Sequence, residues 1–296
     1  MSPQDEPRSS EEPTASGTED PFRVRELRSA EEFEASVRLQ RAVWGAGFSD
    51  CVPATLQRVA EKTGGLVAGA FRDERLQGLV LGLGAVIAGA PSHWSHMLGV
   101  RKEARGHGLG MRLKLFQRDR LLERGIADAY WTFDPLVARN AHLNLNRLGA
   151  EVAEYVVDMY GDHTGSRLHG AMATDRLIVR WRLEGKRARA AIAGAFPGRV
   201  ERVDRGARLL SRSEGSVRAR RPAPARDRIF LEVPSDISSV LQDAPEDAAA
   251  WRVAVREAFR ESLQRGYAVT AFVTTRDCRS YYVLAREGAA PSRPRP

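Results

Sequence analysis

The 296-residue sequence has few of the residues that would indicate several common protein classes. Its two cysteines, Cys51 and Cys278, lie far apart, which excludes a disulfide scaffold and a cysteine-rich zinc module, and we predict no metal site. No run reaches the roughly 18 apolar residues of a membrane span. The first 21 residues carry six acids, one arginine and no apolar core, which excludes a secretory signal peptide. We therefore expect a cytoplasmic protein without membrane association.

Lysine is also scarce, and the positive charge is concentrated in one segment. Only four of the 46 basic residues are lysine, and the net charge is +8. Residues 180–228 hold 15 Lys and Arg against 5 Asp and Glu, which leaves −2 for the rest of the chain. One basic segment is typical of a solvated linker, which we predict over residues 184–225. The alternative is an arginine tract that contacts nucleic acid or anionic lipid, and we favour it less.

Hydrophobic periodicity predicts an α/β domain over residues 22–183. Ser29 and Glu32 have the S-x-x-E spacing of a capping box, which begins a helix. The element order βααβββαβαββ predicts a mixed central sheet with helices on both faces. The strands are expected at residues 22–27, 66–71, 76–87, 93–100, 128–133, 151–160 and 176–183, and the helices after residues 29, 53 and 108 and over residues 139–148.

The remaining segments predict a smaller second unit and two tails. A length of 296 residues is about two domains on a prior of roughly 150 residues each. Residues 226–287 predict a small C-terminal β-α-β-β extension, whose helix covers 245–265. Residues 1–21 form a predicted disordered acidic tail, and 288–296 a second disordered tail.

The most informative segment is Arg101–Gly110, between a predicted strand and an amphipathic helix. A glycine-rich segment before a helix leaves the first backbone amides of the helix unpaired, and no side chain keeps an anion away from them. This predicts a site for a phosphate or pyrophosphate. The alternative is a tight turn that needs glycine only for its backbone conformation. The G-x-G-x-x-G pattern fails because methionine or leucine takes the third glycine position, and the sequence has no Walker P-loop. The pattern that fits is R-x-x-G-x-G, with Arg105, Gly108 and Gly110.

With these residues the chain resembles the GNAT superfamily of acyl-CoA-dependent N-acetyltransferases. The string HMLGVRKEARGHGLGMRL (residues 96–113) is similar to the acyl-CoA loop of that family, and RNAHLNLNRLGAEV (residues 139–152) to its later N…LGF segment. The strings SHMLGV, YWTFDPLVARNAHLNLNRLGA and SYYVL resemble, more closely, a bacterial subgroup of GNAT-like proteins with undefined substrates. The resemblance covers residues 22–183 well and 226–287 loosely.

The resemblance implies that acetyl-CoA is the acyl donor. It also implies which residues bind its pyrophosphate, its pantetheine arm and its thioester. In the family, amides of the loop hold the pyrophosphate, and the pantetheine arm pairs with the strand before the loop. An amide of that strand faces the thioester oxygen and stabilises the oxyanion. The implied cofactor-binding residues are Leu98, Gly99, Val100, Arg105, Gly106, His107, Gly108, Leu109, Gly110 and Asn140.

The acid and the base that such a transfer uses are less clearly marked. His96 and Asp134 are the candidate bases, but a histidine on a strand is also typical of a structural hydrogen bond, and an aspartate before proline of a turn. The family often has a tyrosine four residues before the glycine of the later segment, and Leu145 stands there. His142 and Asn144 are the nearest polar substitutes, or the thiolate leaves unassisted.

Three functions remain open from the sequence. The leading hypothesis is an N-acetyltransferase in which a small-molecule or protein amine attacks the thioester of acetyl-CoA directly. The alternative is an acyl-CoA-binding regulatory or scaffold protein without catalysis. The third is a protein that binds nucleic acid through the arginine tract, with an affinity that falls steeply with salt.

Overall fold

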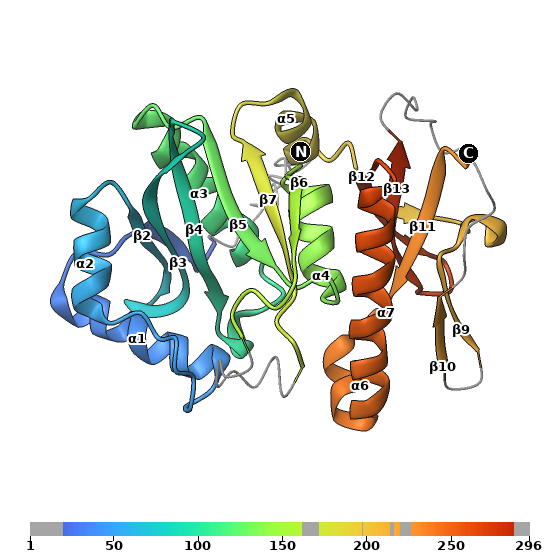
Figure 1. The fold of residues 1–296 in the computed structure, drawn as a ribbon. Helices are drawn as coiled ribbons and strands as arrows, with labels where there is room; N and C mark the ends of the chain where they lie inside the picture. Colours follow the sequence, from blue (N-terminus) through green and yellow to red (C-terminus); the bar gives the residue numbers. More distant parts are fainter. Residues whose placement is uncertain (1–19, 162–171, 197, 214–215, 220–225, 287–296) are drawn as a thin grey trace, which may run out of the picture.

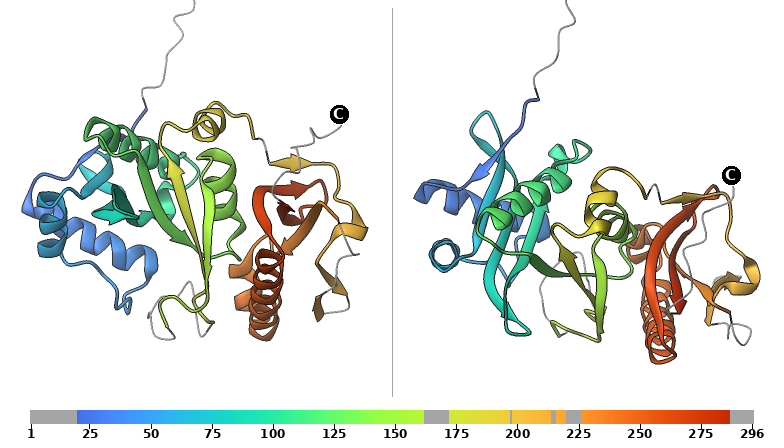
Figure 2. Two further views of the ribbon diagram at one scale, coloured as in Figure 1. Left: turned by 45° about the horizontal axis from the view of Figure 1, so that its top comes forward. Right: turned by 90° about the horizontal axis from the view of Figure 1, so that it is seen from above.

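A computed structural model describes residues 20–161, 172–196, 198–213, 216–219 and 226–286 (Figure 1). Residues 1–19 and 287–296, which make up nearly all of the two predicted tails, lie outside the described residues. Two sheets stand side by side, the larger one in the N-terminal part and the smaller one in the C-terminal part (Figures 1 and 2).

The N-terminal part builds one mixed sheet and its helices. Its elements are β1 (Arg23–Glu26), α1 (Ala30–Trp44), α2 (Ala54–Lys62), β2 (Leu66–Arg72), β3 (Arg75–Ile87), β4 (Ala90–Val100), α3 (Leu109–Glu123), β5 (Asp128–Phe133), α4 (Ala138–Ala141), β6 (Glu151–Val156) and β7 (Arg176–Arg182). The strand order is β1-β2-β3-β4-β5-β7-β6, and only β4 and β5 are parallel neighbours. The helices α1 and α2 cover one face, and α3 and α4 cover the other (Figure 2). The predicted α/β fold class is confirmed.

Local sequence signals account for most of these boundaries. The Ser29 hydroxyl accepts the amide of Glu32 at 3.3 Å, and the Glu32 carboxylate accepts the amide of Ser29 at 3.5 Å, so the predicted capping box begins α1. The helix predicted after residue 139 begins at Ala138 and continues as a π-helical turn over His142–Arg147. The strand predicted over residues 151–160 ends at Val156.

The parallel pair of β4 and β5 opens after two residues. His93 pairs with Ala129 and Trp94 with Tyr130, and beyond these pairs the two strands diverge. At the same level β4 has a bulge, because its residues 95 and 96 oppose the single residue Gly82 of β3. A Cβ on Gly82 would lie 2.0 Å from the His93 ring, so only glycine fits opposite this bulge. The bulge and the divergence together create the opening in which the candidate site lies.

The C-terminal part adds a second, four-stranded sheet. Its elements are α5 (Lys186–Ile192), β8 (Arg199–Val200), β9 (Leu210–Ser213), β10 (Ser216–Ala219), β11 (Arg228–Val233), α6 (Ile237–Asp243), α7 (Pro245–Gln264), β12 (Tyr267–Thr275) and β13 (Ser280–Arg286). The strand order is β11-β13-β12-β8, and β9 and β10 form a separate antiparallel pair. The extension has two helices where the sequence predicts one, because the Asp236 carboxylate accepts the amide of Ser238 at 2.9 Å and begins α6.

The predicted solvated linker over residues 184–225 is corrected by its described part, which is packed. Ala188 and Ala191 of α5 are buried, and β8 pairs in parallel with β12. The Arg187 guanidinium donates to the carbonyl of Thr270 at 2.9 Å, and burial lowers its pKa. Alanines and the aliphatic parts of arginine side chains can pack closely, although a segment rich in arginine has a polar composition.

One hydrophobic core joins the two parts. Trp251 and Phe259 of α7 and Tyr282 of β13 belong to the same buried cluster as Phe133 of β5. The Tyr282 hydroxyl also donates to the carbonyl of Pro135 at 2.9 Å. The C-terminal part is therefore fastened to the end of β5, beside the opening between β4 and β5.

No helix among the described residues is long and apolar enough to cross a membrane.

Candidate functional site

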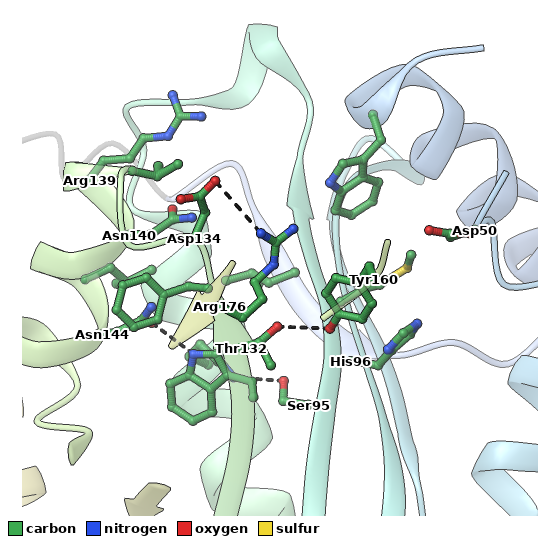
Figure 3. A pocket seen from close by; sticks show the side chains of 18 of the residues that line it. Asp50, Ser95, His96, Thr132, Asp134, Arg139, Asn140, Asn144, Tyr160 and Arg176 are labelled. Atoms are coloured by element: carbon green, nitrogen blue, oxygen red, sulfur yellow. Dashed lines mark hydrogen bonds and ion pairs between the residues drawn. The ribbon is translucent and has the colours of Figure 1, made fainter. Parts of the chain in front are cut away.

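A cavity of about 250 Å³ occupies the opening between β4 and β5 (Figure 3). Its walls come from the two strands, the segment between α1 and α2, the region of α4, the start of α3 and the segment that joins β6 to β7. The lining residues are Trp44, Phe48, Asp50, Ser95, His96, Met97, Leu98, Lys114, Trp131, Thr132, Phe133, Asp134, Val137, Arg139, Asn140, Leu143, Asn144, Tyr160, Arg176 and Ser238.

The glycine-rich segment leads from β4 into the first turn of α3. Gly106 and Gly108 have φ angles of +89° and +68°, and Gly108 is the N-cap residue of α3 without any side-chain cap. The Arg105 side chain turns back to the carbonyl of Val100, with a 3.3 Å hydrogen bond. The first amides of α3 therefore face outward without a described side chain bonded to them, which is the geometry of an anion site.

Two residues of the cavity wall lie next to this turn. The Cβ position of Gly110 lies 3.9 Å from Leu98 and 4.0 Å from Leu143, and both leucines line the cavity. Leu98 to Val100 pair with β3 on one edge, and their other edge faces the opening because β5 has already diverged. An extended ligand with an anion at the α3 turn can therefore run along β4 into the cavity. Asn140 lines the same cavity from α4.

His96 lies at the rim of this cavity, together with Asp50 and Tyr160 (Figure 3). Its ring is exposed at the surface but partly desolvated by the cavity wall, and this desolvation lowers its pKa, while the Asp50 carboxylate opposes the change. A neutral imidazole at neutral pH is able to accept a proton. Of the predicted catalytic residues, His96 has the placement and the protonation state that a base needs.

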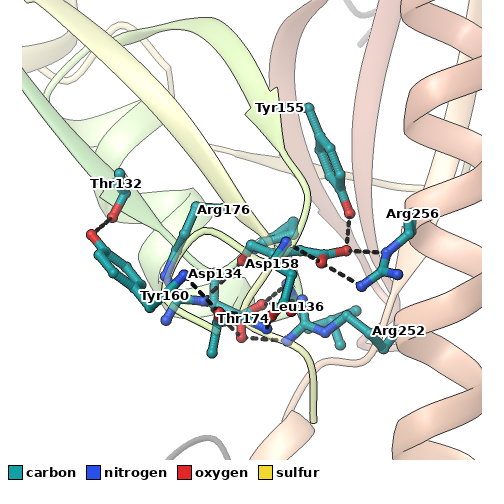
Figure 4. Close-up of polar contacts among 12 residues, drawn as sticks. Thr132, Asp134, Leu136, Tyr155, Asp158, Tyr160, Thr174, Arg176, Arg252 and Arg256 are labelled. Atoms are coloured by element: carbon teal, nitrogen blue, oxygen red, sulfur yellow. Dashed lines mark hydrogen bonds and ion pairs between the residues drawn. The ribbon is translucent and has the colours of Figure 1, made fainter. Parts of the chain in front are cut away.

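Asp134 lines the cavity but is fully engaged in a buried ion-pair network (Figure 4). The Arg252 guanidinium of α7 donates to its two carboxylate oxygens at 2.9 and 2.6 Å, and the amide of Leu136 donates to Oδ1 at 2.8 Å. Arg176 lies 3.9 Å from Oδ2. Both carboxylate oxygens already accept hydrogen bonds from these donors, so the structure corrects Asp134 from a candidate base to a residue that joins β5 to α7.

Replacing Arg252 by methionine should lower the free energy of unfolding by about 3–5 kcal/mol, because the Asp134 carboxylate would stay buried without its main partner. Urea denaturation followed by circular dichroism measures this difference. Arg182→Met is the matched control, because the Arg182–Glu151 pair is exposed and contributes at most about 1 kcal/mol. Adding Asp134→Asn to Arg252→Met should restore part of the loss. Equal stabilities of the Arg252 and Arg182 variants would contradict the assigned role.

His142 and Leu145 lie outside the cavity wall. The Asn146 side-chain amide lies 3.0 Å from Nδ1 of His142 and also donates to the carbonyl of Phe272 at 2.8 Å, so this face of the π-helical turn points toward β12. Leu145 is buried in the core. The structure therefore corrects His142 as a catalytic candidate. Asn144 lines the cavity, and its side-chain oxygen accepts the indole N–H of Trp131 at 3.2 Å.

Several cavity residues carry no recognisable signal in the sequence. Trp44, Asp50 and Tyr160 come from connections and element ends, where side chains have no periodic pattern. Arg176 begins β7 and lies over the Tyr160 ring, 5.1 Å from its centroid. Lys114 lies on α3, where a single lysine is indistinguishable from an exposed one in the sequence. These residues come together only through the packing of the sheet.

No protein-family model and no curated protein matches the chain. The chain is similar to solved structures of N-acetyltransferases. The ribosomal-protein-S18-alanine N-acetyltransferase from Escherichia coli is 14% identical, with 56% of this chain and 97% of that chain covered and a TM-score of 0.44. Arabidopsis thaliana Naa50, in complex with the bisubstrate analogue CoA-Ac-MVNAL, is 14% identical, with 54% and 98% covered and a TM-score of 0.43. An N-acetyltransferase from Staphylococcus aureus Mu50 is 11% identical, with 56% and 100% covered and a TM-score of 0.44.

The N-terminal part has the α/β architecture that the sequence predicts. The observed element order over β1 to β7 is the order βααβββαβαββ that the sequence predicts, and the glycine-rich turn follows β4 as expected. The cofactor-binding residues and the base stay predictions, which the proposal below uses.

Proposed function

We propose that the chain is an acyltransferase that moves an acyl group from acyl-CoA to an amine. The observation that carries this proposal is the opening between the parallel strands β4 and β5, whose lining residues Leu98 and Leu143 lie within 4.0 Å of the Cβ position of Gly110 in the uncapped first turn of α3. This opening offers a site for a phosphate at one end, a strand edge along its length and a cavity at the other end. A phosphopantetheine thioester has an anion, an extended amide chain and an acyl group in the same order.

The backbone supplies most of the binding in this proposal. The amides of Arg105 to Gly110 hold the pyrophosphate at the N-terminus of α3, where the helix dipole also favours an anion. The free edge of β4 from Leu98 to Val100 pairs with the amides of the pantetheine arm. Asn140 contacts that arm from α4. An amide of β4 then faces the thioester oxygen and stabilises the negative charge that develops on it.

The transfer itself needs one proton to be removed. The amine nitrogen attacks the thioester carbon, the new C–N bond forms, and the C–S bond breaks as the thiolate leaves. His96 accepts the proton that the amine loses, directly or through a water molecule. A thiol pKa near 8.5 makes the thiolate a good leaving group without an acid, in agreement with leucine at position 145.

The rim of the cavity is suited to an amine acceptor. Trp44 and Phe48 stack with ring centroids 5.6 Å apart, and the Asp50 carboxylate lies on the same side as His96. An ammonium group is attracted both to a carboxylate and to aromatic faces before it loses its proton. The acceptor is therefore a small-molecule or protein amine that enters from this side.

Acetyl-CoA at 100 times its dissociation constant should stabilise the chain by about 2.7 kcal/mol, because it binds only the folded state. Thermal denaturation with acetyl-CoA, and with NAD as the control ligand, measures this effect. Release of free thiol from acetyl-CoA with a panel of amines then separates catalysis from binding alone. A shift with NAD but none with acetyl-CoA would overturn the proposal. Binding without amine-dependent thiol release from any acyl-CoA donor, including succinyl-CoA, would favour the non-catalytic alternative.

A further inference from the structure

Lys114 is a lysine buried in the closed end of the cavity. Its side chain is only 2% exposed, and lysine is almost never buried to this degree unless it is paired. Nζ donates to the Ser95 hydroxyl at 2.8 Å and to the Gln117 side-chain oxygen at 3.1 Å, and it lies 3.6 Å from the centroid of the Trp131 ring. All of these partners are neutral.

The lysine has no counter-charge among the residues that the structure describes. No described carboxylate lies within ion-pair distance of it, and burial alone lowers the pKa of its ammonium group well below the usual range. An ammonium group has three N–H donors, and only two have described acceptors here. The third N–H faces the Trp131 ring, so the lysine has neutral partners only, and an anion that enters the cavity stabilises its charged form.

The position of Lys114 corresponds to the end of the acyl group in the proposed complex. Gly110 lies in the first turn of α3, and Lys114 lies one helical turn farther along it. Ser95 directly follows Trp94, the last residue of β4 that pairs with β5, so Ser95, Lys114 and Trp131 line the end at which the opening closes. A thioester that extends from the α3 turn along Leu98 directs its acyl chain toward this end.

The charges of the other lining residues agree with an anionic ligand group. The wall contains Lys114, Arg139 and Arg176 against Asp50 and Asp134. Asp134 is already compensated by Arg252, which lies behind the wall, and it also pairs with Arg176 at 3.9 Å, which leaves Lys114 and Arg139 against Asp50. The cavity therefore has an excess of positive charge at some distance from the anion site at the α3 turn.

We infer that the acyl group carried by this enzyme ends in a carboxylate, which the Lys114 ammonium binds, so that the donor is the CoA monothioester of a dicarboxylic acid. The inference rests on the proposed acyl transfer and adds the class of acyl group to it. The reaction balances as before: the C–N bond forms, the C–S bond breaks, CoA leaves as the thiol, and the terminal carboxylate is unchanged.

The test compares succinyl-CoA with butyryl-CoA, because both acyl groups have four carbons and differ in the terminal carboxylate. For the wild type, we expect kcat/KM for succinyl-CoA to exceed that for butyryl-CoA by about 10²-fold or more. In Lys114→Met this ratio should fall by about 10²–10³-fold, the loss expected when one partner of a buried charge pair is removed. Lys62→Met is the matched control, because Lys62 is exposed on α2, and it should keep the wild-type ratio. Malonyl-CoA and glutaryl-CoA then define the chain length.

Each outcome separates this inference from the proposed function. A wild type that binds and uses acetyl-CoA or butyryl-CoA as well as succinyl-CoA overturns the carboxylate inference alone. The carboxylate inference is also overturned if Lys114→Met keeps the preference for succinyl-CoA. It is overturned as well if this variant changes the KM of the amine but not the ratio of kcat/KM for succinyl-CoA to that for butyryl-CoA. Failure of the wild type to bind free CoA overturns the proposed function itself. Affinity for free CoA shows whether the site of Lys114→Met is intact. Should this variant not fold, the wild-type donor comparison still decides the question.

Discussion

Replacing Gly108 by valine is expected to reduce the affinity for acetyl-CoA by at least about 100-fold while the fold is kept. The φ angle of Gly108 is +68°, which a β-branched residue adopts only with strain. A relaxed backbone at this position would turn the first amides of α3 away from the pyrophosphate, and the valine side chain would occupy the space that the phosphate needs. No described atom lies within 4 Å of its Cβ position, so the core itself meets no clash.

Gly125→Val provides a matched control for this experiment. Gly125 follows the other end of α3, has a φ angle of +73° and also has no described atom within 4 Å of its Cβ position. Both variants should therefore lose similar stability, but only Gly108→Val should lose affinity, as measured by isothermal titration calorimetry with acetyl-CoA. Gly110→Val should weaken binding as well, because its side chain would stand in the same turn. It should keep the fold, because the nearest atoms to its Cβ position are at ordinary contact distances. Wild-type affinity in Gly108→Val would remove the α3 turn from the site.

Replacing His96 by glutamine is expected to lower kcat/KM for the amine by about 10²–10⁴-fold and to abolish one limb of the pH profile. Burial lowers the pKa of His96 below its ordinary value of 6.5, and Asp50 opposes this change only in part. The imidazole is therefore neutral at neutral pH, and it becomes protonated, and inactive as a base, as the pH falls through its lowered pKa. The wild-type kcat/KM should rise with pH through this lowered pKa and then level off.

The measurement uses one amine acceptor of known pKa throughout, because deprotonation of the acceptor also produces a rising limb. His142→Gln is the control, since His142 lies outside the cavity. We expect no contact between His142 and either the acyl-CoA donor or the amine acceptor. It should stay within about threefold of the wild type and keep the same profile. Affinity for acetyl-CoA should be similar in both variants. An identical pH profile in His96→Gln and the wild type would exclude His96 as the base.

Local patterns in the sequence predict most of the elements of the N-terminal part. The S-x-x-E spacing at Ser29 begins α1, alternation predicts the strands, and the glycine-rich run marks the entry to α3, since each of these signals depends on neighbours within a few residues. The segment over residues 184–225 is different. Its arginines and alanines give no clear periodicity, yet α5 and β8 form there because α5 buries its alanines and β8 pairs with β12 from the end of the chain.

The chemistry of the site divides in the same way. The sequence by itself determined the α/β class and the glycine-rich turn before α3, because a strand, a glycine-rich run and an amphipathic helix specify that geometry locally. Only the tertiary structure decided which titratable groups are free. Asp134 is engaged because α7, more than 100 residues later in the chain, brings Arg252 to it, and Lys114 is buried because α3 packs against Ser95 and Trp131 of two diverging strands. Protonation and reactivity depend on the charges and the solvent around a group, and these are set by contacts between residues distant in sequence.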